Sequence, residues 1–446
     1  MLLALCGLVC LGANCVGAAD TLVWRPRQSE FDANIKATSL TNILRRIKAA
    51  TGWDVVYEPV AAPAVSVKFK GLPENDALRR LLGKLNFAKE VTNGITRLRV
   101  FQTASSAATQ IIIAEKKDYL IRNELLVKLK HNAPGAIEEL AAKLHAKIVG
   151  RDDRIGLYRL QFDDEAAANS ALQSLSADDS PAVAAHNYIV DPPNPSQFGP
   201  SSGGPPNPAS LINPKAPADG GLVVGLIDTG IQSLDGLDKY MLKPISVVGQ
   251  ADIPTDTPSH ATGMFETMLQ AMSDSPSMIQ PVVIYKDGEE TTTYQLMEGI
   301  LAAVNSGANP INLSLGGTGA PTAADGTDML HSLIQAATQK GVVFVAASGN
   351  DPGGGPTYPA AYPEVLSVTA LAPNGQLASY ADNFPGVKSS APGTSYVSYG
   401  GQMWVFTGTS GSTAWTTGGI VEQYNQTHAP LSQIVAQWGQ LHPAPR

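Results

Sequence analysis

Short apolar runs alternate with amphipathic segments in the C-terminal half of the chain, between residues 217 and 432. The apolar runs are LVVGLI (222–227), PVVIY (281–285), INLSL (311–315), VVFVAA (342–347) and VLSVTA (365–370). Between them, segments such as YQLMEGILAAVN and DMLHSLIQAATQKG have the spacing of helices. Strands that are apolar on both faces are typical of a parallel sheet covered by helices on both sides. The pattern predicts an α/β fold with a doubly wound, mostly parallel sheet, whose chemistry lies beyond the carboxyl ends of the strands.

Two smaller α+β units are expected before this region. In the first, residues 22–103, apolar residues recur at helical spacing in SLTNILRRIKAATGW and ENDALRRLLGKLNF and alternate in VSVKFKG. No residue of this unit looks catalytic. In the second, residues 119–191, the segments ELLVKLK, IGLYRLQF and AAHNYIV are expected strands, and PGAIEELAAKL and EAAANSALQSL are expected helices.

A run rich in Pro, Gly and Ser, DPPNPSQFGPSSGGPPNPAS, follows the second unit over residues 191–210. We expect a linker over residues 192–216. Such a run is not expected to pack, and exposed linkers of this kind are preferred sites of proteolytic cleavage.

Residues 1–19 differ from the rest of the chain. LLALCGLVCLG is apolar and uncharged, and small residues follow in VGAA. This is typical of a secretory signal peptide cleaved near Ala18 or Ala19, although no basic residue precedes the apolar run; an uncleaved anchor is the alternative. All three cysteines lie in this segment, so we expect a mature chain without disulfides, a thiolate nucleophile or a cysteine metal site.

Composition and charge narrow the function classes. The chain has 446 residues, of which 43% are hydrophobic and 16% charged, and its net charge is −8 without a long run of either sign. Because nucleic-acid binding requires a basic face, this argues against a nucleic-acid partner. No apolar run after residue 19 has the length of a membrane span. We therefore expect a secreted or periplasmic protein with no membrane span after signal cleavage.

Three polar residues suggest nucleophilic chemistry. Asp228 directly follows LVVGLI, His260 opens the helical segment HATGMFETMLQAM, and Ser410 lies in GTSGST, ahead of a run of small residues. Each alone has a structural explanation: an Asp that begins a turn, a core His, or a Gly/Ser/Thr loop. Together they supply a nucleophile at the start of a helix, a base and an orienting carboxylate.

Two further segments are expected at the same edge of the sheet. Asn350 follows a strand in VAASGN, where its side-chain amide can donate to a developing oxyanion; a plain Gly-Asn turn is the alternative. INLSLGG (311–317) ends in a Gly-Gly edge that we expect to be unpaired and able to pair with an extended peptide.

The chain order is Asp, His, Asn, Ser. Asp-His-Ser is the subtilisin order, whereas α/β-hydrolases have Ser-Asp-His, and GTSGST does not supply their G-x-S-x-G elbow. With VVGLIDTG, SHATGM, INLSLGG, AASGN, SVTAL, APG and GTSGSTA in order, residues 217–432 resemble the subtilisin-like serine peptidases, or subtilases. Residues 119–191 then resemble the family's propeptide, an inhibitory folding domain that ends in the strand HNYIV.

The resemblance implies a role for each residue. Ser410 would be the nucleophile, His260 would move its proton to the leaving amine, and Asp228 would hold the imidazole. The Asn350 amide and the Ser410 backbone N–H would bind the oxyanion. The substrate cleft would be lined by Ser314, Leu315, Gly316 and Gly317. The chemistry requires no metal; structural calcium is common in the family, but the sequence offers no ligand set that can be assigned.

This sequence departs from the family's pattern close to the site. Ala261 stands where the family usually has Gly, and Gly263 replaces its next His. After Ser410, residues 411–415 read Gly-Ser-Thr-Ala-Trp instead of Met-Ala-Ser-Pro-His. Ser412 is a rival nucleophile, but the GTS register favours Ser410. These departures bear on substrate preference and efficiency more than on the type of reaction.

Residues 22–103 resemble the short domain at the N-termini of secretins and TonB-dependent receptors, which is periplasmic and mediates protein contacts. The resemblance rests on apolar patterns over about 80 residues, and a small α+β domain of another role is the alternative. The resemblance implies that this domain binds another protein of the cell envelope. The first functional hypothesis is a secreted or periplasmic serine endopeptidase made as a self-processing zymogen, acting on peptides and inhibited by its own propeptide. The second is a catalytically weak or silent subtilase fold that serves as a binding or regulatory protein of the cell envelope.

Overall fold

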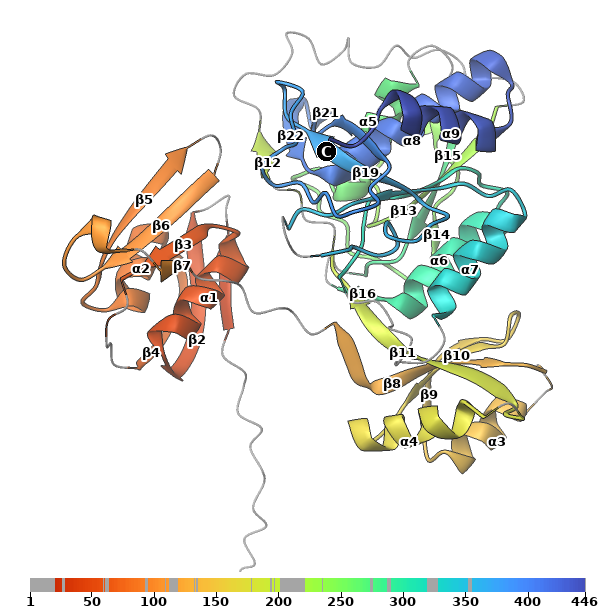
Figure 1. The fold of residues 1–446 in the computed structure, drawn as a ribbon, viewed down its shortest axis with the longest axis horizontal. Helices are drawn as coiled ribbons and strands as arrows, with labels where there is room; N and C mark the ends of the chain where they lie inside the picture. Colours follow the sequence, from red (N-terminus) through yellow and green to blue (C-terminus); the bar gives the residue numbers. More distant parts are fainter. Residues whose placement is uncertain are drawn as a thin grey trace, which may run out of the picture. The chain divides into compact units, whose positions relative to one another are not determined.

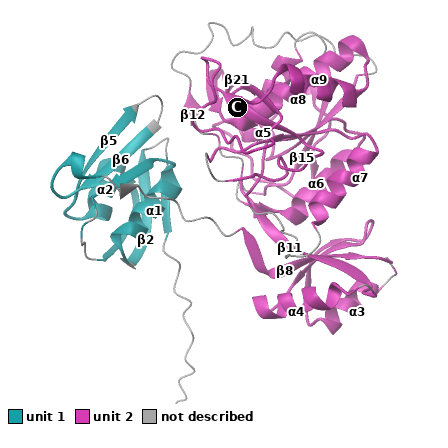
Figure 2. Ribbon diagram, in the orientation of Figure 1, with its two compact units in different colours: residues 1–116 teal, residues 117–446 magenta. Residues whose placement is uncertain are grey.

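The chain forms two compact units in a computed structural model, residues 1–116 and residues 117–446, and each is described by itself (Figure 2). The predicted signal peptide and most of the predicted linker lie outside the residues that the structure describes. These are residues 21–25, 29–58, 60, 64–92, 95–108, 110–111, 119–131, 133, 135–177, 179–192, 195, 197–200, 221–234, 236–272, 276–286, 290–318, 328–351 and 355–445.

The first unit contains two small sheets and two helices around one apolar core. Its elements are β1 (Thr21–Arg25), β2 (Glu30–Thr38), α1 (Leu40–Thr51), β3 (Asp54–Tyr57), β4 (Val65–Pro73), α2 (Glu74–Leu82), β5 (Asn86–Thr92), β6 (Ile95–Phe101), a 3-10 turn (Ser105–Ala107) and β7 (Gln110–Ile111). The sheets have the strand orders β1-β2-β4 and β5-β6-β3-β7. Both predicted helices are confirmed, and their apolar faces, including Ile43, Leu44, Leu78 and Leu81, are fully buried.

Residues 120–190 of the second unit form an antiparallel sheet covered by two helices. The elements are β8 (Leu120–Leu129), α3 (Ala136–Lys143), β9 (Lys147–Asp152), β10 (Leu157–Gln161), α4 (Glu165–Leu175) and β11 (Ala182–Val190). The sheet order is β16-β11-β8-β10-β9, in which β16 (Thr291–Thr292) comes from the α/β region. The predicted elements of this segment are confirmed, except that the sequence pattern missed β9.

A seven-stranded parallel sheet organises the rest of the second unit, as predicted. Its order is β14 (Ile245–Ser246), β15 (Met278–Val283), β13 (Val223–Asp228), β17 (Ile311–Leu313), β18 (Phe344–Ala347), β19 (Leu366–Leu371) and β20 (Ser389–Pro392). The helices are α5 (His260–Ala271), α6 (Thr293–Asn305), α7 (Met329–Gln339), α8 (Thr409–Thr427) and α9 (Leu431–Leu441), and a 3-10 turn covers Asp238–Tyr240. The pattern missed β14 and β20, which are the short or less apolar edge strands.

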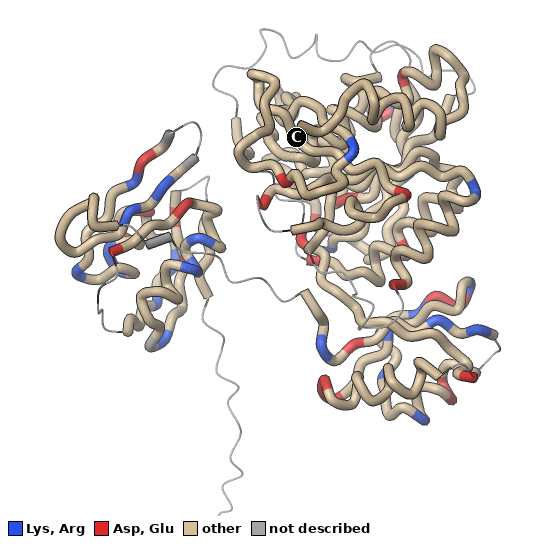
Figure 3. Tube along the Cα trace, in the orientation of Figure 1, with Lys and Arg blue, Asp and Glu red and all other residues tan. Residues whose placement is uncertain are grey.

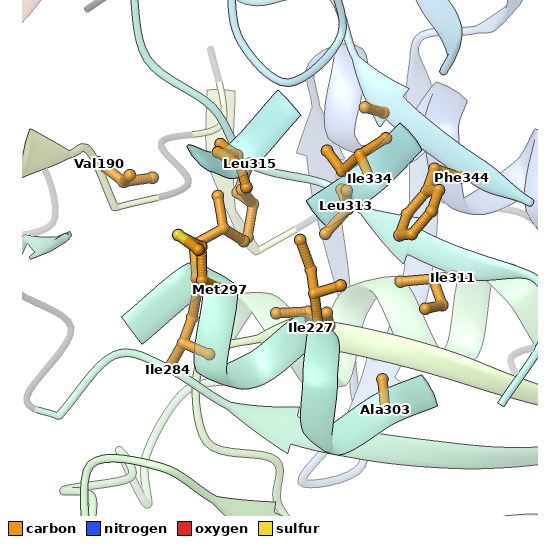
Figure 4. Packing of buried hydrophobic residues seen from close by; sticks show 14 of the residues in the cluster. Val190, Ile227, Ile284, Met297, Ala303, Ile311, Leu313, Leu315, Ile334 and Phe344 are labelled. Atoms are coloured by element: carbon orange, nitrogen blue, oxygen red, sulfur yellow. The ribbon is translucent and has the colours of Figure 1, made fainter. Parts of the chain in front are cut away.

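Two apolar cores lie on opposite faces of the sheet. Helices α6 and α7 cover one face, where Ile227 packs among residues such as Leu313 and Met297 (Figure 4). Helices α5 and α8 cover the other face, where Val224 and Leu226 are buried (Figure 1). Because successive side chains of a strand point to opposite faces, β13 distributes its residues alternately between the two cores.

A three-stranded antiparallel sheet lies beside the core formed by α5 and α8. Its order is β12 (Gln197–Pro200), β22 (Gln402–Thr407) and β21 (Thr394–Tyr399). The expectation that residues 192–216 remain unpacked is therefore wrong for residues 197–200. Their pairing was missed because a Pro- and Gly-containing segment gives little strand signal and its partner strand lies some 200 residues further along the chain.

The sheet of residues 120–190 is joined to the α/β region at the start of α6. Ile189 and Val190 of β11 pair with Thr292 and Thr291 of β16. Helix α6 has no side-chain bond from its own N-cap residue, and the backbone N–H of Tyr294 instead donates to Asn187 Oδ1 at 3.3 Å. The other end of the Asn187 amide donates to Glu124 Oε2 within the same sheet.

Charged residues are distributed unevenly over the described elements. Lys and Arg are scattered singly over the α/β region and are more frequent in the first unit and on residues 120–190 (Figure 3). Within the described ranges, no helix combines the length and the apolar character needed to cross a membrane.

Candidate active site

Asp228 is the last residue of β13. Since Val224 and Leu226 face α5 and α8, the alternation of the strand directs the Asp228 side chain to that same face. The carboxylate is fully buried, and its Oδ1 accepts a 2.6 Å hydrogen bond from the backbone N–H of Thr229. A buried, fixed carboxylate thus faces the start of helix α5.

His260 is the first residue of α5, as the sequence predicts. The helix begins there because Ser259 is its N-cap, with Oγ accepting from the backbone N–H of Thr262 at 3.1 Å. Gln232 holds this cap in place, since its Oε1 accepts from the Ser259 N–H and its Nε2 donates to the carbonyls of Pro254 and Thr257. The position of the imidazole is therefore set by the helix start and by the loop after β13.

Asp228 and His260 form a buried pair. His260 Nδ1 lies 2.9 Å from Asp228 Oδ1 and 2.8 Å from Oδ2. The opposite ring nitrogen, Nε2, is buried and has no hydrogen-bond partner among the described residues. Tyr285 is also buried nearby, where burial first and then the charges of Asp228 and Asp191 raise the pKa of its phenol well above the ordinary value. Tyr285 is thus a neutral neighbour that donates to the Asp191 carbonyl at 2.7 Å.

Ser410 is the second residue of α8 and is 5% exposed. Its Oγ donates to the Ser314 carbonyl at 3.1 Å, and Ser314 Oγ donates back to the Ser410 carbonyl at 2.9 Å. Strands β13 and β17 are parallel neighbours with Leu226 opposite Asn312, so Asp228 at the end of β13 and Ser314 just after β17 both lie at the carboxyl end of the sheet. Ser410 therefore lies at the same end of the sheet as the Asp228–His260 pair, and in the described structure its Oγ bonds to Ser314 and not to His260.

Asn350 follows β18 and contacts the residues just before Ser410. Its Oδ1 accepts from the backbone N–H of Thr409 at 2.9 Å and from Thr409 Oγ1 at 3.1 Å. Its Nδ2 lies beside Gly408, where a methyl group built onto the glycine would come within 3.0 Å. The donor end of the amide is therefore held at the start of α8, where the unpaired backbone N–H groups and the helix dipole favour negative charge.

The segment Ser314–Gly317 lies between the triad residues and the loop that carries Tyr358. The backbone N–H of Gly317 donates to the Tyr358 carbonyl at 3.0 Å, and the Tyr358 N–H donates to the Gly317 carbonyl at 2.8 Å. The prediction of an unpaired Gly-Gly edge is thus wrong for Gly317, because a loop more than 40 residues later folds back onto it. Asn312 orients the Ser314 side chain, because Asn312 Nδ2 donates a 2.9 Å hydrogen bond to Ser314 Oγ.

Thr357 is a residue of the site that no sequence pattern indicated. A methyl group built onto Gly316 would come 2.6 Å from Thr357 Cγ2, and one built onto Gly349 would come 2.7 Å from Thr357 Oγ1. The buried Thr357 side chain therefore fills the space between the two backbone segments that flank Ser410. Its place depends on the loop after β18, which has no pattern that links it to the site.

Comparisons with known proteins agree with this geometry. A family model described as the subtilase family matches residues 219–430, and one described as the fervidolysin N-terminal prodomain matches residues 106–187. Subtilisin from Bacillus pumilus is 30% identical over 215 residues, which are 44% of this chain and 74% of that protein. The chain belongs to the subtilase family.

Other relatives of this subtilase match shorter shares of their own length. The minor extracellular protease Epr from Bacillus subtilis (strain 168) is 40% identical over 104 residues, 23% of this chain and 15% of that protein. Among solved structures, fervidolysin from Fervidobacterium pennivorans, a keratinolytic enzyme related to subtilisin, gives a TM-score of 0.55 at 20% identity. That match covers 72% of this chain and 57% of fervidolysin. The chain thus spans less than two thirds of the length of these two proteins.

The departure at Gly263 has a packing explanation in this subtilase. A methyl group at this position would come 2.9 Å from the ring of Phe406 on β22, so the helix and the ring meet with no room for a side chain. Phe406 in turn faces the His260 ring edge-on, with 6.5 Å between the ring centroids. Beside it, the Ala261 N–H donates to Thr229 Oγ1 at 3.0 Å, which ties α5 to the residue after Asp228.

The departures after Ser410 also have local explanations. A methyl group at Gly411 would come 2.6 Å from Ser395 Oγ on β21. Ser412 is fully buried, and its Oγ donates to the carbonyls of Ala391 and Pro392 at 3.2 and 3.1 Å. The rival nucleophile is therefore turned into the core, whereas Ser410 faces the end of the sheet.

The described residues contain no group of three or more His, Cys, Asp or Glu side chains placed to hold a metal ion.

Glu266 on α5 is a buried carboxyl group and is 1% exposed. Its Oε2 accepts a hydrogen bond from the Ser398 N–H at 2.9 Å, and its Oε1 has no hydrogen-bond partner in the described part of the chain. Burial raises the pKa of the Glu266 carboxyl to about 8, against the lowering effect of the Ser398 bond.

Proposed function

We propose that this protein is a serine endopeptidase that hydrolyses peptide bonds through Asp228, His260 and Ser410. The observation that carries the proposal is the buried Asp228–His260 pair, whose ring nitrogen Nε2 has no partner among the described residues, at the end of the sheet where Ser410 is the second residue of α8. A serine hydroxyl needs an adjacent base to act as a nucleophile, and a base needs a fixed orientation and tautomer. Ser410 supplies the hydroxyl, His260 the base, and Asp228 the group that orients the base.

The reaction follows from these positions. Ser410 Oγ turns from the Ser314 carbonyl and attacks the peptide carbonyl carbon, while His260 Nε2 takes its proton and Asp228 stabilises the imidazolium. The Asn350 amide and the Ser410 backbone N–H donate to the oxygen that becomes negative. His260 then gives the proton to the leaving amine, and an ester to Ser410 remains. Water, deprotonated by the same nitrogen, hydrolyses this ester and restores Ser410.

We also propose that residues 119–191 act as an inhibitory propeptide and that the chain processes itself after this segment. The support is the match of residues 106–187 to a prodomain and the docking of β11 against β16 and α6. The chain then returns to β22 with only five residues between Asp191 and Gln197. The proposed cleavage falls in or shortly after this segment, whose two flanking strands are both held on the α/β region.

A fluorophosphonate probe tests the nucleophile directly. Purified wild type should be labelled on Ser410 and cleaved between residues 191 and 217, whereas Ser410→Ala should remain full-length and unlabelled. Ser412→Ala is the matched control and should still be labelled, because Ser412 is buried and bonded to β20. Equal processing in Ser410→Ala, or a folded wild type that the probe does not label, contradicts the proposal; the second result supports the silent binding protein instead.

For the first unit, we propose the role that its resemblance to the N-terminal domain of secretins and TonB-dependent receptors implies, a contact with another envelope protein. Its support is a compact core of its own, and the secreted or periplasmic location rests on residues 1–19. A photo-crosslinker placed on the exposed side of α1 in the full chain should give one discrete adduct in cells. No adduct at any of several exposed positions contradicts an envelope partner without touching the proposed activity.

A further inference from the structure

Strand β12 lies along β22 in the orientation of a peptide leaving the site. The pairing is antiparallel, with Gln197 opposite Thr407, Phe198 opposite Phe406, and Pro200 opposite Trp404. Thr407 is three residues before Ser410, so the chain runs away from Ser410 as it passes from Gln197 to Pro200. Gln197 is therefore the residue of β12 that pairs closest along β22 to Ser410.

The other end of the same short segment is held on the opposite side of the site. The Asp191 carbonyl accepts from Tyr285 at 2.7 Å, and the Asp191 carboxylate accepts from Tyr119 at 2.6 Å. The Ile189 carbonyl lies 3.5 Å from a methyl group built onto Gly317. The segment that ends at Asp191 thus lies beside Gly317, and the segment that begins at Gln197 lies on β22.

The side chain of Phe198 fills an aromatic slot. Its ring stacks on Trp404 with centroids 5.3 Å apart and planes at 18°, and it packs at 51° against Phe406 with centroids 4.7 Å apart. Trp404 and Phe406 are 5% and 3% exposed with Phe198 in place. Phe406 also faces the His260 ring. The slot therefore lies next to the residue that protonates the leaving amine in the proposed reaction.

We infer that β22, with Trp404 and Phe406, is a binding site for the leaving side of a peptide substrate and that it selects an aromatic side chain. The substrate adds a strand to β22, which supplies main-chain hydrogen bonds, while the slot supplies the side-chain preference. Residues 197–200 are its first occupant. The inference rests on the proposed peptidase function and adds a substrate class to it.

The position of the aromatic residue follows from the sequence around the slot. Three of the six bonds between Asp191 and Gln197 precede a proline, whose ring replaces the N–H of the leaving nitrogen. The bond next to β12 that avoids a proline nitrogen is Ser196–Gln197. Its cleavage places Phe198 second on the leaving side.

Matched peptides test the inference with processed wild type. Two internally quenched peptides differ only in Phe or Ala at the second leaving-side position, and a third substrate carries an anilide leaving group with no leaving-side residues. Burial of one aromatic side chain predicts a kcat/KM about 10- to 100-fold higher for the Phe peptide. Trp404→Leu should bring this ratio close to one, and the kcat/KM of each variant for the two peptides is compared with its own kcat/KM for the anilide, so that a general loss of activity is separated from a loss of the preference.

Trp438→Leu is the matched control, since Trp438 packs against Gly419 on α8, away from β22; its Phe-to-Ala ratio should equal that of wild type. A ratio near one in labelled, active wild type overturns the inference and leaves the peptidase proposal intact. Cleavage at Ser196–Gln197 leaves residues 197–200 at the new N-terminus, and an unchanged ratio in Trp404→Leu would mean that they still fill the slot, which also overturns the inference. Absence of labelling in wild type counts against the peptidase proposal instead.

Discussion

His260 contacts both carboxylate oxygens of Asp228 through Nδ1, at 2.8 and 2.9 Å, and leaves Nε2 buried without a partner in the described structure. The contact keeps the Nδ1 proton on the side of the carboxylate, because an ionised carboxylate only accepts hydrogen bonds. The lone pair of Nε2 is consequently available to a hydroxyl that approaches from α8.

Asp228→Asn should lower kcat by about 10⁴-fold with little change in KM, because an amide can hold the ring in the wrong tautomer while it keeps the geometry. The measurement is kcat on an anilide substrate. Asp252→Asn, in an exposed loop, is the matched control and should retain wild-type kcat. A kcat within tenfold of wild type in Asp228→Asn argues against the proposed role of the carboxylate.

Asn350→Ala should lower kcat by about 10²–10³-fold, the usual loss for one oxyanion donor. Thr409→Val should give a smaller loss of kcat at unchanged KM, because it removes the hydroxyl that bonds to Asn350 Oδ1 but keeps the backbone N–H bond. Thr409 is thus a positioning residue. Steady-state kinetics of both variants check this, and a rise in KM alone would mean that Asn350 acts in binding only.

Thr357→Gly should admit larger side chains before the scissile bond. Removing the side chain between Gly316 and Gly349 opens the space that it fills, and differences of a few methyl or methylene groups in a pocket change kcat/KM by about 10- to 200-fold. We expect the ratio of kcat/KM for Phe over Ala at this position to rise by at least tenfold. Thr357→Ser, which keeps most of the volume, is the control and should change the ratio little.

Glu266→Gln should change how stability depends on pH. Burial raises the pKa of Glu266 from 4.5 to about 8, so between these values the unfolded chain loses the proton while the folded chain keeps it. The free energy of unfolding therefore falls through this window as pH rises, by about 1.4 kcal/mol per pH unit from this group alone. Above pH 8 its contribution is constant.

Denaturant unfolding from pH 5 to pH 9 measures this dependence, and a Ser410→Ala background prevents self-digestion. The stability of Glu266→Gln relative to its parent should rise steadily up to about pH 8 and then level off. Glu290→Gln, at an exposed position, controls for the loss of one carboxyl group. Parallel curves for Glu266→Gln and its parent would show that Glu266 is already ionised in the folded protein.

The parts of the fold that followed from the sequence are those with strong periodicity. LVVGLI predicted β13 because central parallel strands are apolar on both faces. The face of Asp228 could also have been derived, since it alternates with Val224 and Leu226. The helix start at His260 was visible in the apolar stripe that follows it, and Ser259 is an ordinary N-cap residue.

The parts that could not be predicted depend on contacts between distant segments. Nothing near Gly317 indicates that Tyr358 pairs with it, and nothing near Phe198 indicates Trp404. Thr357 enters the site because two glycines leave space for its side chain. Such contacts are set by the tertiary fold and leave no periodic trace in the local sequence.

The hydrogen bond from the Tyr294 N–H to Asn187 means that α6 takes its first-turn cap from a segment that the proposed processing removes. In the proposed mature form, α6 would begin with the Tyr294 N–H bonded only to water. We therefore expect the chain without residues 119–191 to refold more slowly than the full chain, so that removal of this segment makes unfolding harder to reverse.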